Sequence, residues 1–460
     1  MSTANAPEPV DAASAASATS ATNAADVTGA MHAPGGAGAA WWREPSRGQW
    51  MSFFAAWFGW VLDAFDFTVF LLVMPQIAKD FRVTITATAW TVTLTLLLRL
   101  VGGVVAGAAA DRWGRKLPLM LSVVWFAACD GAVAFAPSFT WVLVLRTLFG
   151  LGMGAEWASG ATLAMENWPV RSRGIASGVL QGSWAIGYLL ASVVSGAVLR
   201  SGGTWRTLFL LAALPAILVL PIRIWVPESL PERRDRARAD VAAARVERAR
   251  VLRTIGWGSF FMALAFSAYY GITALYPTFL IKELKLAPGD IGTLVALFNV
   301  GMLAGAIACG YLAARWSPIG AIMVCALMTL PILPFYVGWV PGWSGWLYVG
   351  AVLGGVFGGG YAGVTPLLLT AIFPAHLRAR SVGFVYHIGA CFAAFVPTII
   401  ASLVERVGLD YAHAIALVTG GFQLALAVAI VFRPRNVFEA ADPVAPPPVA
   451  AAIEGVPTAT

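Results

Sequence analysis

Two aspartates within an apolar run are the residues of this sequence best suited to chemistry. Asp63 and Asp66 are three positions apart, so a helix would place both carboxyl groups on one face. An acidic side chain inside a membrane is costly and usually tied to function. Two carboxyl groups in a low-dielectric environment disfavour each other's ionised form, so one of them can hold a proton near neutral pH. The pair therefore predicts a proton-binding site.

Further charged residues fall in other apolar runs. Arg99 is expected at a similar depth to Asp63, and Arg146 and Glu156 share a later run. An arginine beside the aspartates would release the proton when substrate or conformation changes the pairing. Glu156 joins the aspartate pair as a proton-coupling candidate, whereas Arg99 and Arg146 are candidates for binding a substrate carboxylate. A static ion network is the alternative for Arg146 and Glu156. For Asp130, the sequence leaves open a cavity role or a position near the outer membrane face.

The composition indicates what must position these charges. The chain has 460 residues, 59% of them hydrophobic and 12% charged, with a mean hydropathy of +0.76. Soluble domains are about 45–50% apolar and about 25% charged, so a water-soluble enzyme is excluded. The net charge of +7 fits arginines at a cytoplasmic membrane surface. We expect no nucleic-acid partner.

Twelve apolar stretches are expected to cross the membrane as helices, since each crossing needs about 20 apolar residues. The fold class is therefore an all-α membrane protein with two six-helix bundles, at 49–225 and 255–433. A cytoplasmic central loop at 226–254 joins them, and disordered cytoplasmic tails occupy 1–48 and 434–460. Arginines and lysines gather on the side that holds both tails, which predicts cytoplasmic termini. The stretches are 50–75, 86–110, 117–137, 139–163, 173–199, 206–225, 255–280, 289–314, 319–340, 345–372, 381–403 and 410–432.

The two halves resemble each other. Pro75, which closes the first stretch, has a counterpart in Pro277 at an offset of 202, and Pro169 has one in Pro374 at an offset of 205. Two parallel six-helix repeats around a midplane cavity are known from transporters. Two glycine pairs also match at an offset of 205, Gly150 with Gly355 and Gly154 with Gly359.

The second half has lost the charges of the first. Ala265 and Ala268 stand where the repeat would place Asp63 and Asp66, so proton handling is assigned to the first half. The second half would supply a polar and aromatic wall for substrate, although each residue of that wall could instead serve helix packing. The wall candidates are Tyr269, Tyr270, Asn299, Tyr361, Tyr386, His387 and Gln423.

Cysteine and histidine show no metal-binding pattern. The four cysteines lie in apolar runs without a C-x-x-C pair, and the four histidines are scattered. The cysteines are interpreted as packing residues and the histidines show no metal-ligand spacing, so no disulfide framework, metal site or cofactor is expected.

The loop after the second stretch carries a recognisable motif, Gly107-x3-Asp111-Arg112-x-Gly114-Arg115-Lys116. It resembles the signature loop of the major facilitator superfamily. In that family the aspartate caps a charge network that closes the cytoplasmic side in the outward-open state. The resemblance implies a gating role for this loop. Gating residues are expected at Gly107, Asp111, Arg112, Gly114, Arg115, Glu166 and Arg173. The copy in the second half has Ala314 in place of the acid.

Two longer runs narrow the resemblance. Residues 57–67 and 74–81, together with Arg99, Arg146 and Glu156, are similar to the sialate:proton symporter family, which includes monocarboxylate permeases. This resemblance implies a proton-coupled importer of an organic anion in the cytoplasmic (inner) membrane, working by alternating access as a monomer. The expected substrate is a monocarboxylate or a sialic-acid-type sugar acid.

Other functions stay open. The aromatic-acid:proton symporters also carry an Asp-x-x-Asp pair in the first span, usually with Gly where Ala64 stands. A drug:proton antiporter would normally show a Gly-Pro-Gly-Gly-like motif in the fifth span, and the proline is missing from 178–188. A non-transporting sensor with the same fold would usually carry a larger cytoplasmic extension. An enzyme has no catalytic constellation to support it.

Overall fold

The computed structural model describes residues 41–214, 241–374 and 377–434, and all regular structure within these ranges is helical. The predicted tails lie mostly outside them, as does the first part of the central loop. The first half contains η1 (Trp41–Arg43), α2 (Arg47–Asp80), α3 (Ile85–Trp113), α4 (Lys116–Ala134), α5 (Phe139–Asn167), η2 (Val170–Ser172), α6 (Arg173–Arg200) and α7 (Trp205–Ala212).

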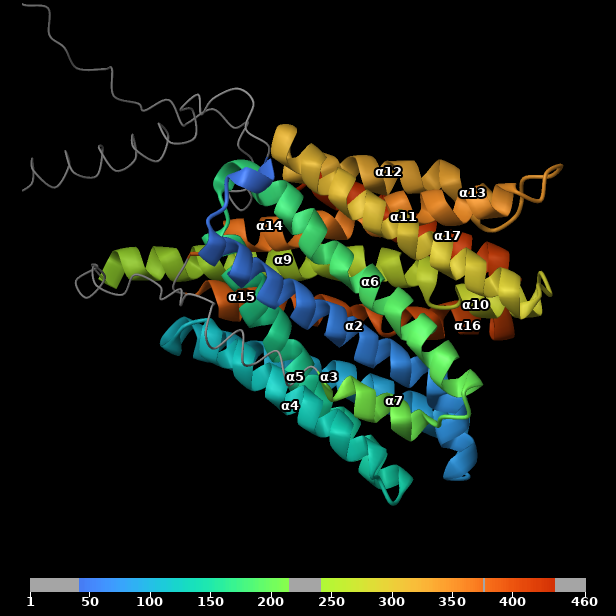
Figure 1. Cartoon of the computed structure of the whole chain (residues 1–460). Coiled ribbons are helices and arrows are strands. Elements are labelled where there is room, and N and C mark those ends of the chain that lie inside the picture. The colour runs from blue at the N-terminus through green and yellow to red at the C-terminus, as the bar shows by residue number, and fades with distance from the viewer. Residues whose placement is uncertain (1–40, 215–240, 375–376, 435–460) are drawn as a thin grey trace, which may run out of the picture.

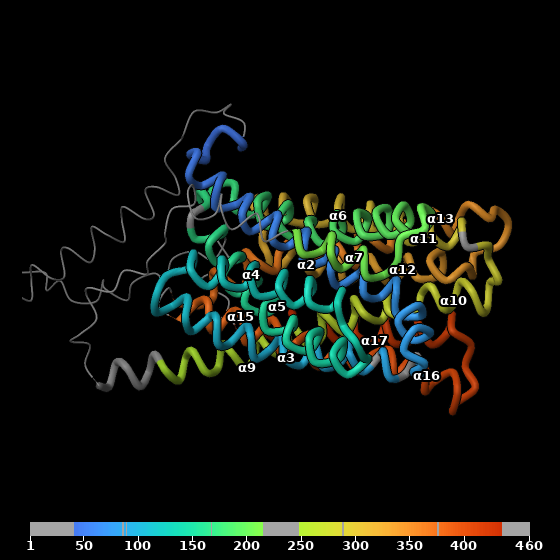
Figure 2. Tube along the Cα trace, turned by 60° about the horizontal axis from the view of Figure 1, so that its bottom comes forward, coloured from blue at the N-terminus to red at the C-terminus, as the bar shows by residue number. Residues whose placement is uncertain are grey.

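The second half starts with α9 (Val241–Thr273), which reaches well before the expected start of the seventh span (Figures 1 and 2). The remaining elements are α10 (Tyr276–Lys282), α11 (Pro288–Arg315), α12 (Pro318–Tyr336), α13 (Trp346–Leu353), η4 (Gly354–Gly359), η5 (Gly360–Val364), α14 (Thr365–Ile372), α15 (Arg378–Ala393), α16 (Val396–Val407) and α17 (Tyr411–Val431).

Ten helical segments among the described residues are long and apolar enough to cross a membrane. Two of the twelve expected spans are not among them. The fourth is α5, a 29-residue helix that packs along α3 and α4. The sixth begins with α7, and its remaining part, from 215, lies outside the described residues.

The helices form two bundles that meet along two seams. Within the first half α5 packs on α2, α3 and α4, and within the second α17 packs on α9 and α12. Between the halves, α3 runs against α15, and α6 runs against α11. In Figure 1, α12 and α13 of the second half lie at one side of the molecule and α4 and α7 of the first half at the other, with α2, α6, α9 and α15 between them.

The seams are tight at one end of the molecule, here called the gate end. Gly107 on α3 lies against the backbone of Ala379 and Arg380, and Gly174 on α6 lies against the Gly310 carbonyl of α11. A Cβ atom at either glycine would collide with that backbone, so only glycine permits the approach.

The opposite end, here called the far end, is splayed. There α6 and α11 separate around a cavity of about 470 Å³ that Leu199 and Ile291 help to line. The molecule is therefore closed at the gate end and open toward the far end.

Three spans of the second half are interrupted, and their sequences explain why. The break between α9 and α10 precedes Pro277, and the break between α15 and α16 precedes Pro397. The tenth span passes through a π-helical turn in the glycine-rich segment 354–359. Proline lacks a backbone donor and glycine stabilises helix poorly, so both favour such breaks.

One expectation about helix ends is wrong. α2 continues through Pro75 to Asp80, so this proline does not close the first span. Ile77 and Ala78 beyond it are buried, and their packing offsets the hydrogen bond that the proline removes.

The repeat is visible in the coordinates. The Arg173 guanidinium donates to the carbonyl of Trp168, and the Arg378 guanidinium donates to the carbonyl of Phe373. The two contacts stand at the offset of 205 seen in the sequence.

Candidate functional site

A cavity between the bundles is lined by both halves. Its free volume is about 50 Å³, enough for water molecules. One wall comes from the first half, where Arg99 is the charged group. The first-half residues are Arg99, Gln181 and Trp184, and the second-half residues are Met262, Ala265, Phe266, Tyr269, Tyr270, Met302, Tyr361, Ala362, Thr365, Tyr386 and Ala390.

Arg99 on α3 faces Asp63 on α2, as the sequence predicted. Arg99 Nη2 lies 3.6 Å from Asp63 Oδ2, and both side chains are buried. Neither oxygen of Asp63 accepts a hydrogen bond from the described residues, and Arg99 Nε and Nη2 also donate none there. The pair is therefore attracted electrostatically without being locked by hydrogen bonds.

Aromatic faces hold the Arg99 guanidinium. Its Cζ lies 5.9 Å from the ring centroids of both Trp184 and Tyr386. These two rings come from opposite bundles, so the guanidinium is placed between the halves by cation–π contacts.

Glu156 on α5 completes a group that we call the cavity cluster: Asp63, Arg99 and Glu156. Glu156 is 1% exposed and lies within electrostatic range of both other members. Gly59 on α2 makes the room, because a Cβ atom there would meet the Glu156 carboxyl group. The cluster thus holds two carboxyl groups for one guanidinium.

A second group, here called the inner cluster, consists of Asp66, Asp130 and Arg146. Arg146 Nη1 donates to Asp130 Oδ1 at 2.7 Å, and Asp66 lies beside both residues. All three are at most 1% exposed. The sequence did not decide the place of Asp130, and the structure puts it inside the first bundle.

Arg146, predicted as a substrate-binding candidate, does not line the central cavity. Its Cζ lies 4.9, 4.1 and 5.6 Å from the ring centroids of Phe70, Phe149 and Phe209. Enclosed by these rings and paired with Asp130, the guanidinium points into the bundle.

The predicted aromatic wall is present in part. Tyr269, Tyr270, Tyr361 and Tyr386 line the central cavity. The Tyr386 ring stacks on Trp157 of the first half, with centroids 3.5 Å apart, and the Tyr361 hydroxyl donates to the Ala265 carbonyl. Stacking across the bundles means that this wall must rearrange when the bundles separate.

Three other wall candidates lie elsewhere. Asn299 lines the far-end cavity, and Gln423 lies inside the second bundle, where its Nε2 donates to Thr329 Oγ1 at 3.4 Å. His387 lies in the seam, with Nε2 3.3 Å from the Gly154 carbonyl. A polar side chain in an apolar helix needs a hydrogen-bond partner. A neighbouring group within the same bundle can supply that partner as well as a ligand in the cavity can.

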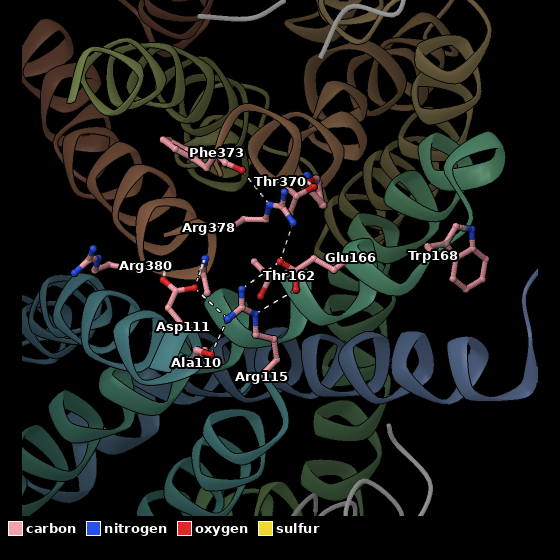
Figure 3. A network of polar contacts seen from close by, with 12 residues as sticks. Ala110, Asp111, Arg115, Thr162, Glu166, Trp168, Thr370, Phe373, Arg378 and Arg380 are labelled. Carbon is pink, nitrogen blue, oxygen red and sulfur yellow. Dashed lines mark hydrogen bonds and ion pairs between the residues drawn. The ribbon is translucent and has the colours of Figure 1, made fainter. Parts of the chain in front are cut away.

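The gate end carries a charge network (Figure 3). Arg115 donates to both oxygens of Glu166 at 3.2 Å and lies 3.1 Å from Asp111. Glu166 also accepts from Arg378 Nη1, across the bundles, at 2.9 Å. Asp111 crosses the same seam, because its carboxylate accepts the backbone N–H groups of Ala379 and Arg380 at 3.1 and 3.0 Å.

Of the remaining gate candidates, Gly114 and Arg173 lie beside this network and Arg112 lies outside it. Gly114 ends α3 with a φ of 99°, a conformation that favours glycine. Arg173 binds the Trp168 carbonyl near the network. Arg112 points away, exposed, with its guanidinium over Trp113, so it is not a member.

The sequence missed several members of both sites, although the repeat contained a signal. Arg378 is the counterpart of the predicted Arg173 at the offset of 205, and Gln181 is likewise the counterpart of the predicted Tyr386. Met302 stands 203 positions after Arg99, and both line the central cavity. Within the described residues, no group of three or more His, Cys, Asp or Glu residues could hold a metal ion.

Comparison with known proteins agrees with this architecture. The family model described as Major Facilitator Superfamily matches residues 56–286 and 255–453. A probable 4-methylmuconolactone transporter of Cupriavidus pinatubonensis is 30% identical over 80% of this chain and 87% of its own length. A sialic acid transporter of Escherichia coli (strain K12) is 28% identical over 85% of this chain and 96% of its own.

A solved structure shares the fold. The proton:xylose symporter XylE superposes with a TM-score of 0.70 at 18% identity, covering 85% of this chain and 98% of its own. The fold, the family match and the relatives agree, which makes the chain a multi-pass membrane transport protein rather than an enzyme. The chain belongs to the major facilitator superfamily.

Proposed function

We propose that the protein is a proton-coupled symporter that imports a small organic anion across the cytoplasmic (inner) membrane. The gate end faces the cytoplasm in this proposal, since the arginine-rich connections gather there. The bundles at 49–225 and 255–433 are the two moving bodies. One chain lines the whole cavity, so we propose that the monomer is the working unit.

The observation that carries the proposal is the loose pairing of Arg99 with Asp63. A substrate carboxylate that enters the cavity competes for Arg99, whose buried Nε and Nη2 donate no hydrogen bond to the described residues. Asp63 then loses its positive partner while its side chain stays buried, and a lone buried carboxylate is strongly disfavoured. Taking up a proton resolves this, so anion binding and proton binding favour each other.

Alternating access follows from the two ends of the molecule. The present conformation is open toward the far end and closed by the Asp111–Arg115–Glu166–Arg378 network at the other. The proton on Asp63 offsets the charge that the anion brings, so loading adds no net charge to the cavity cluster, which favours closing the cavity to water. Opening of the gate end then exposes the anion and the proton to the cytoplasm.

The cavity favours a flat, unsaturated carboxylate. Six of its lining residues are aromatic, and rings stack on planar ligands, whereas a sugar acid would leave many hydroxyl groups to satisfy. The relative named for 4-methylmuconolactone agrees with this choice. A sialic-acid-type sugar acid is the second candidate, because the E. coli relative is named for that substrate.

Uptake into proteoliposomes tests the proposal. Nicotinate, benzoate, cis,cis-muconate, N-acetylneuraminate and lactate would be offered singly with an acidic outside, and protein-free liposomes would correct for leakage of the neutral acids. We expect protein-dependent accumulation of an aromatic or unsaturated acid, with alkalinisation outside. Accumulation of N-acetylneuraminate alone would favour the second candidate. Proton movement opposite to the anion would indicate an antiporter.

Two substitutions test which residues bind the proton and the anion. Asp63→Asn should abolish accumulation driven by the pH difference. Asp80→Asn is the matched control on the same helix, since Asp80 lies away from the cavity, 47% exposed at the side chain. Arg99→Gln should weaken anion binding at least about 30-fold, because it removes the buried charge that meets the carboxylate. Full pH-driven uptake by Asp63→Asn would refute the assignment.

A further inference from the structure

Buried charged side chains of the first bundle form two clusters, each with two carboxyl groups for one guanidinium. The cavity cluster has two carboxyl groups, Asp63 and Glu156, for the single guanidinium of Arg99. The inner cluster also has two, Asp66 and Asp130, for that of Arg146. All six side chains are at most 5% exposed. With every group ionised, each cluster would carry one uncompensated negative charge among buried side chains.

The geometry of the inner cluster shows where a proton belongs. Arg146 binds Asp130 through Oδ1, while Oδ2 of Asp130 and both oxygens of Asp66 lack a hydrogen-bond donor among the described residues. The two carboxyl groups are close enough to interact through their side chains. Two carboxylates cannot hydrogen-bond to each other, because neither has a hydrogen to donate. A proton on Asp66 supplies that hydrogen and satisfies Asp130 Oδ2.

The inner cluster is separate from the substrate site. The charged groups that face Asp66 are Asp63 on its own helix, Asp130 on α4 and Arg146 on α5. No member of the inner cluster lines the central cavity. Asp66 nevertheless lies one helical turn from Asp63, so a movement of α2 that exposes one aspartate displaces the other as well.

We propose that Asp66, held by Asp130 and Arg146, is a second proton site, and that two protons accompany each substrate anion. This inference rests on the proposed function. In the conformation closed at the gate end the Asp66 carboxyl group keeps its O–H bond. When the gate end opens and water reaches the cluster, that bond breaks and the proton leaves as hydronium. The cluster then carries one net negative charge, which hydration tolerates. Import of a monovalent anion with two protons moves one positive charge inward.

Infrared spectroscopy of the purified protein tests the site without any substrate. At pH 8 exposed acids are ionised, so absorption from protonated carboxyl groups reports buried ones. Asp66→Asn should lose part of this absorption. Asp130→Asn should lose the same part, because Arg146 would then pair with an ionised Asp66. Asp80→Asn should leave it unchanged. Absorption that is the same in wild type, Asp66→Asn and Asp130→Asn would overturn the second site.

The number of protons transported with each anion can be measured from the anion concentration gradient at which net uptake stops. The substrate would be the panel acid that the wild type accumulates. At zero membrane potential a pH difference of one unit supports about tenfold accumulation with one proton and about 100-fold with two. We expect the larger value for the wild type and the smaller for Asp66→Asn. An inside-negative potential should raise uptake by the wild type and leave Asp66→Asn unaffected.

The outcomes separate the two proposals. If uptake is proton-coupled but electroneutral, with about tenfold accumulation in both the wild type and Asp66→Asn, the proton on Asp66 is not transported. The symporter proposal would stand and the two-proton stoichiometry would be overturned. Absence of proton-coupled uptake of every panel acid rejects the symporter and the stoichiometry together, while the infrared result still decides whether Asp66 holds a proton.

Discussion

Asp111→Asn should weaken closure of the gate end. The Asp111 carboxylate is the group of the first bundle that binds the N-terminus of α15, through the N–H groups of Ala379 and Arg380. An asparagine side chain keeps one acceptor oxygen and places an NH₂ group where the other stood. One of the two N–H donors therefore loses its partner, and the remaining bond is no longer assisted by charge.

The expected magnitude follows from these contacts. A hydrogen bond to a charged group contributes about 1.5–3 kcal/mol, and a negative charge at a helix N-terminus adds about 0.3–1 kcal/mol. Losing one such bond and weakening the other should cost about 2–3 kcal/mol. Because about 1.4 kcal/mol is tenfold in an equilibrium constant, the population closed at the gate end should fall about 30- to 140-fold relative to the opposite state.

Spin-label distances across the far end can measure this shift. Ser201 follows α6 and Gly289 lies near the start of α11. Both positions are exposed, and a Cβ atom at Gly289 would have nothing within 4 Å. Labels would be attached to cysteines at these positions in a protein whose Cys391, the native cysteine that is not buried, is replaced by serine. Opening of the gate end should shorten the distance between the labels.

Arg112→Gln is the matched control, since Arg112 is the next residue and is exposed outside the network. Its distance distribution should equal that of the wild type. A wild-type distribution for Asp111→Asn, or an equal shift for Arg112→Gln, would refute the view that the bond to α15 sets the balance between the states.

Two more substitutions test the packing and the buried charges. Gly103→Ala should open the α3–α15 seam, because its Cβ atom would collide with the His387 ring. At a cost of about 1–3 kcal/mol, it should shorten the far-end distance, and an unchanged distance would contradict the packing argument. Arg146→Gln should lower the melting temperature in detergent, because breaking a buried ion pair costs about 3–5 kcal/mol. The loss should be smaller at pH 6 than at pH 8, where the unpaired carboxyl groups less readily take up protons, and equal losses would speak against the ion pair.

The sequence predicted contacts that depend on position along a helix. Asp63 and Arg99 could be paired because each lies at a similar depth in its own span, and helix rise converts residue counts into depth. The gate loop could be recognised because its residues are adjacent in the chain. In both cases the deciding geometry is local or set by the membrane.

Rotation about the helix axis could not be predicted in the same way. Helices buried in a bundle and surrounded by lipid are apolar all round, so no polar stripe shows which face points to the cavity. Arg146 and Gln423 therefore looked like cavity residues and instead face the interior of their own bundles. The Arg378–Glu166 pair depends on how the two bundles dock, and no periodicity within one helix encodes that.

The α3–α15 and α6–α11 seams differ in the charged residues that they contain at the gate end. Asp111, Arg115 and Glu166 have Ala314, Pro318 and Ala371 as their counterparts in the second half. The α6–α11 seam therefore lacks the first half's charge network and closes through glycine packing, whereas the α3–α15 seam has the charge network in addition to its glycines.

Because α3 carries both Arg99 and Asp111, about 18 Å apart along one helix, the arginine that we propose for substrate binding and the aspartate that binds α15 move as one body. An anion that draws Arg99 away from Asp63 acts on the same helix that holds the gate closed. In the proposed mechanism, anion binding at Arg99 and the charges of the gate end can then be coupled without any ionisable group, beyond tyrosines, among the second-bundle residues that line the cavity. The proposed coupling therefore needs buried acids in one copy alone, and among the described residues Asp63, Asp66, Asp130 and Glu156, the buried acids, all belong to the first half.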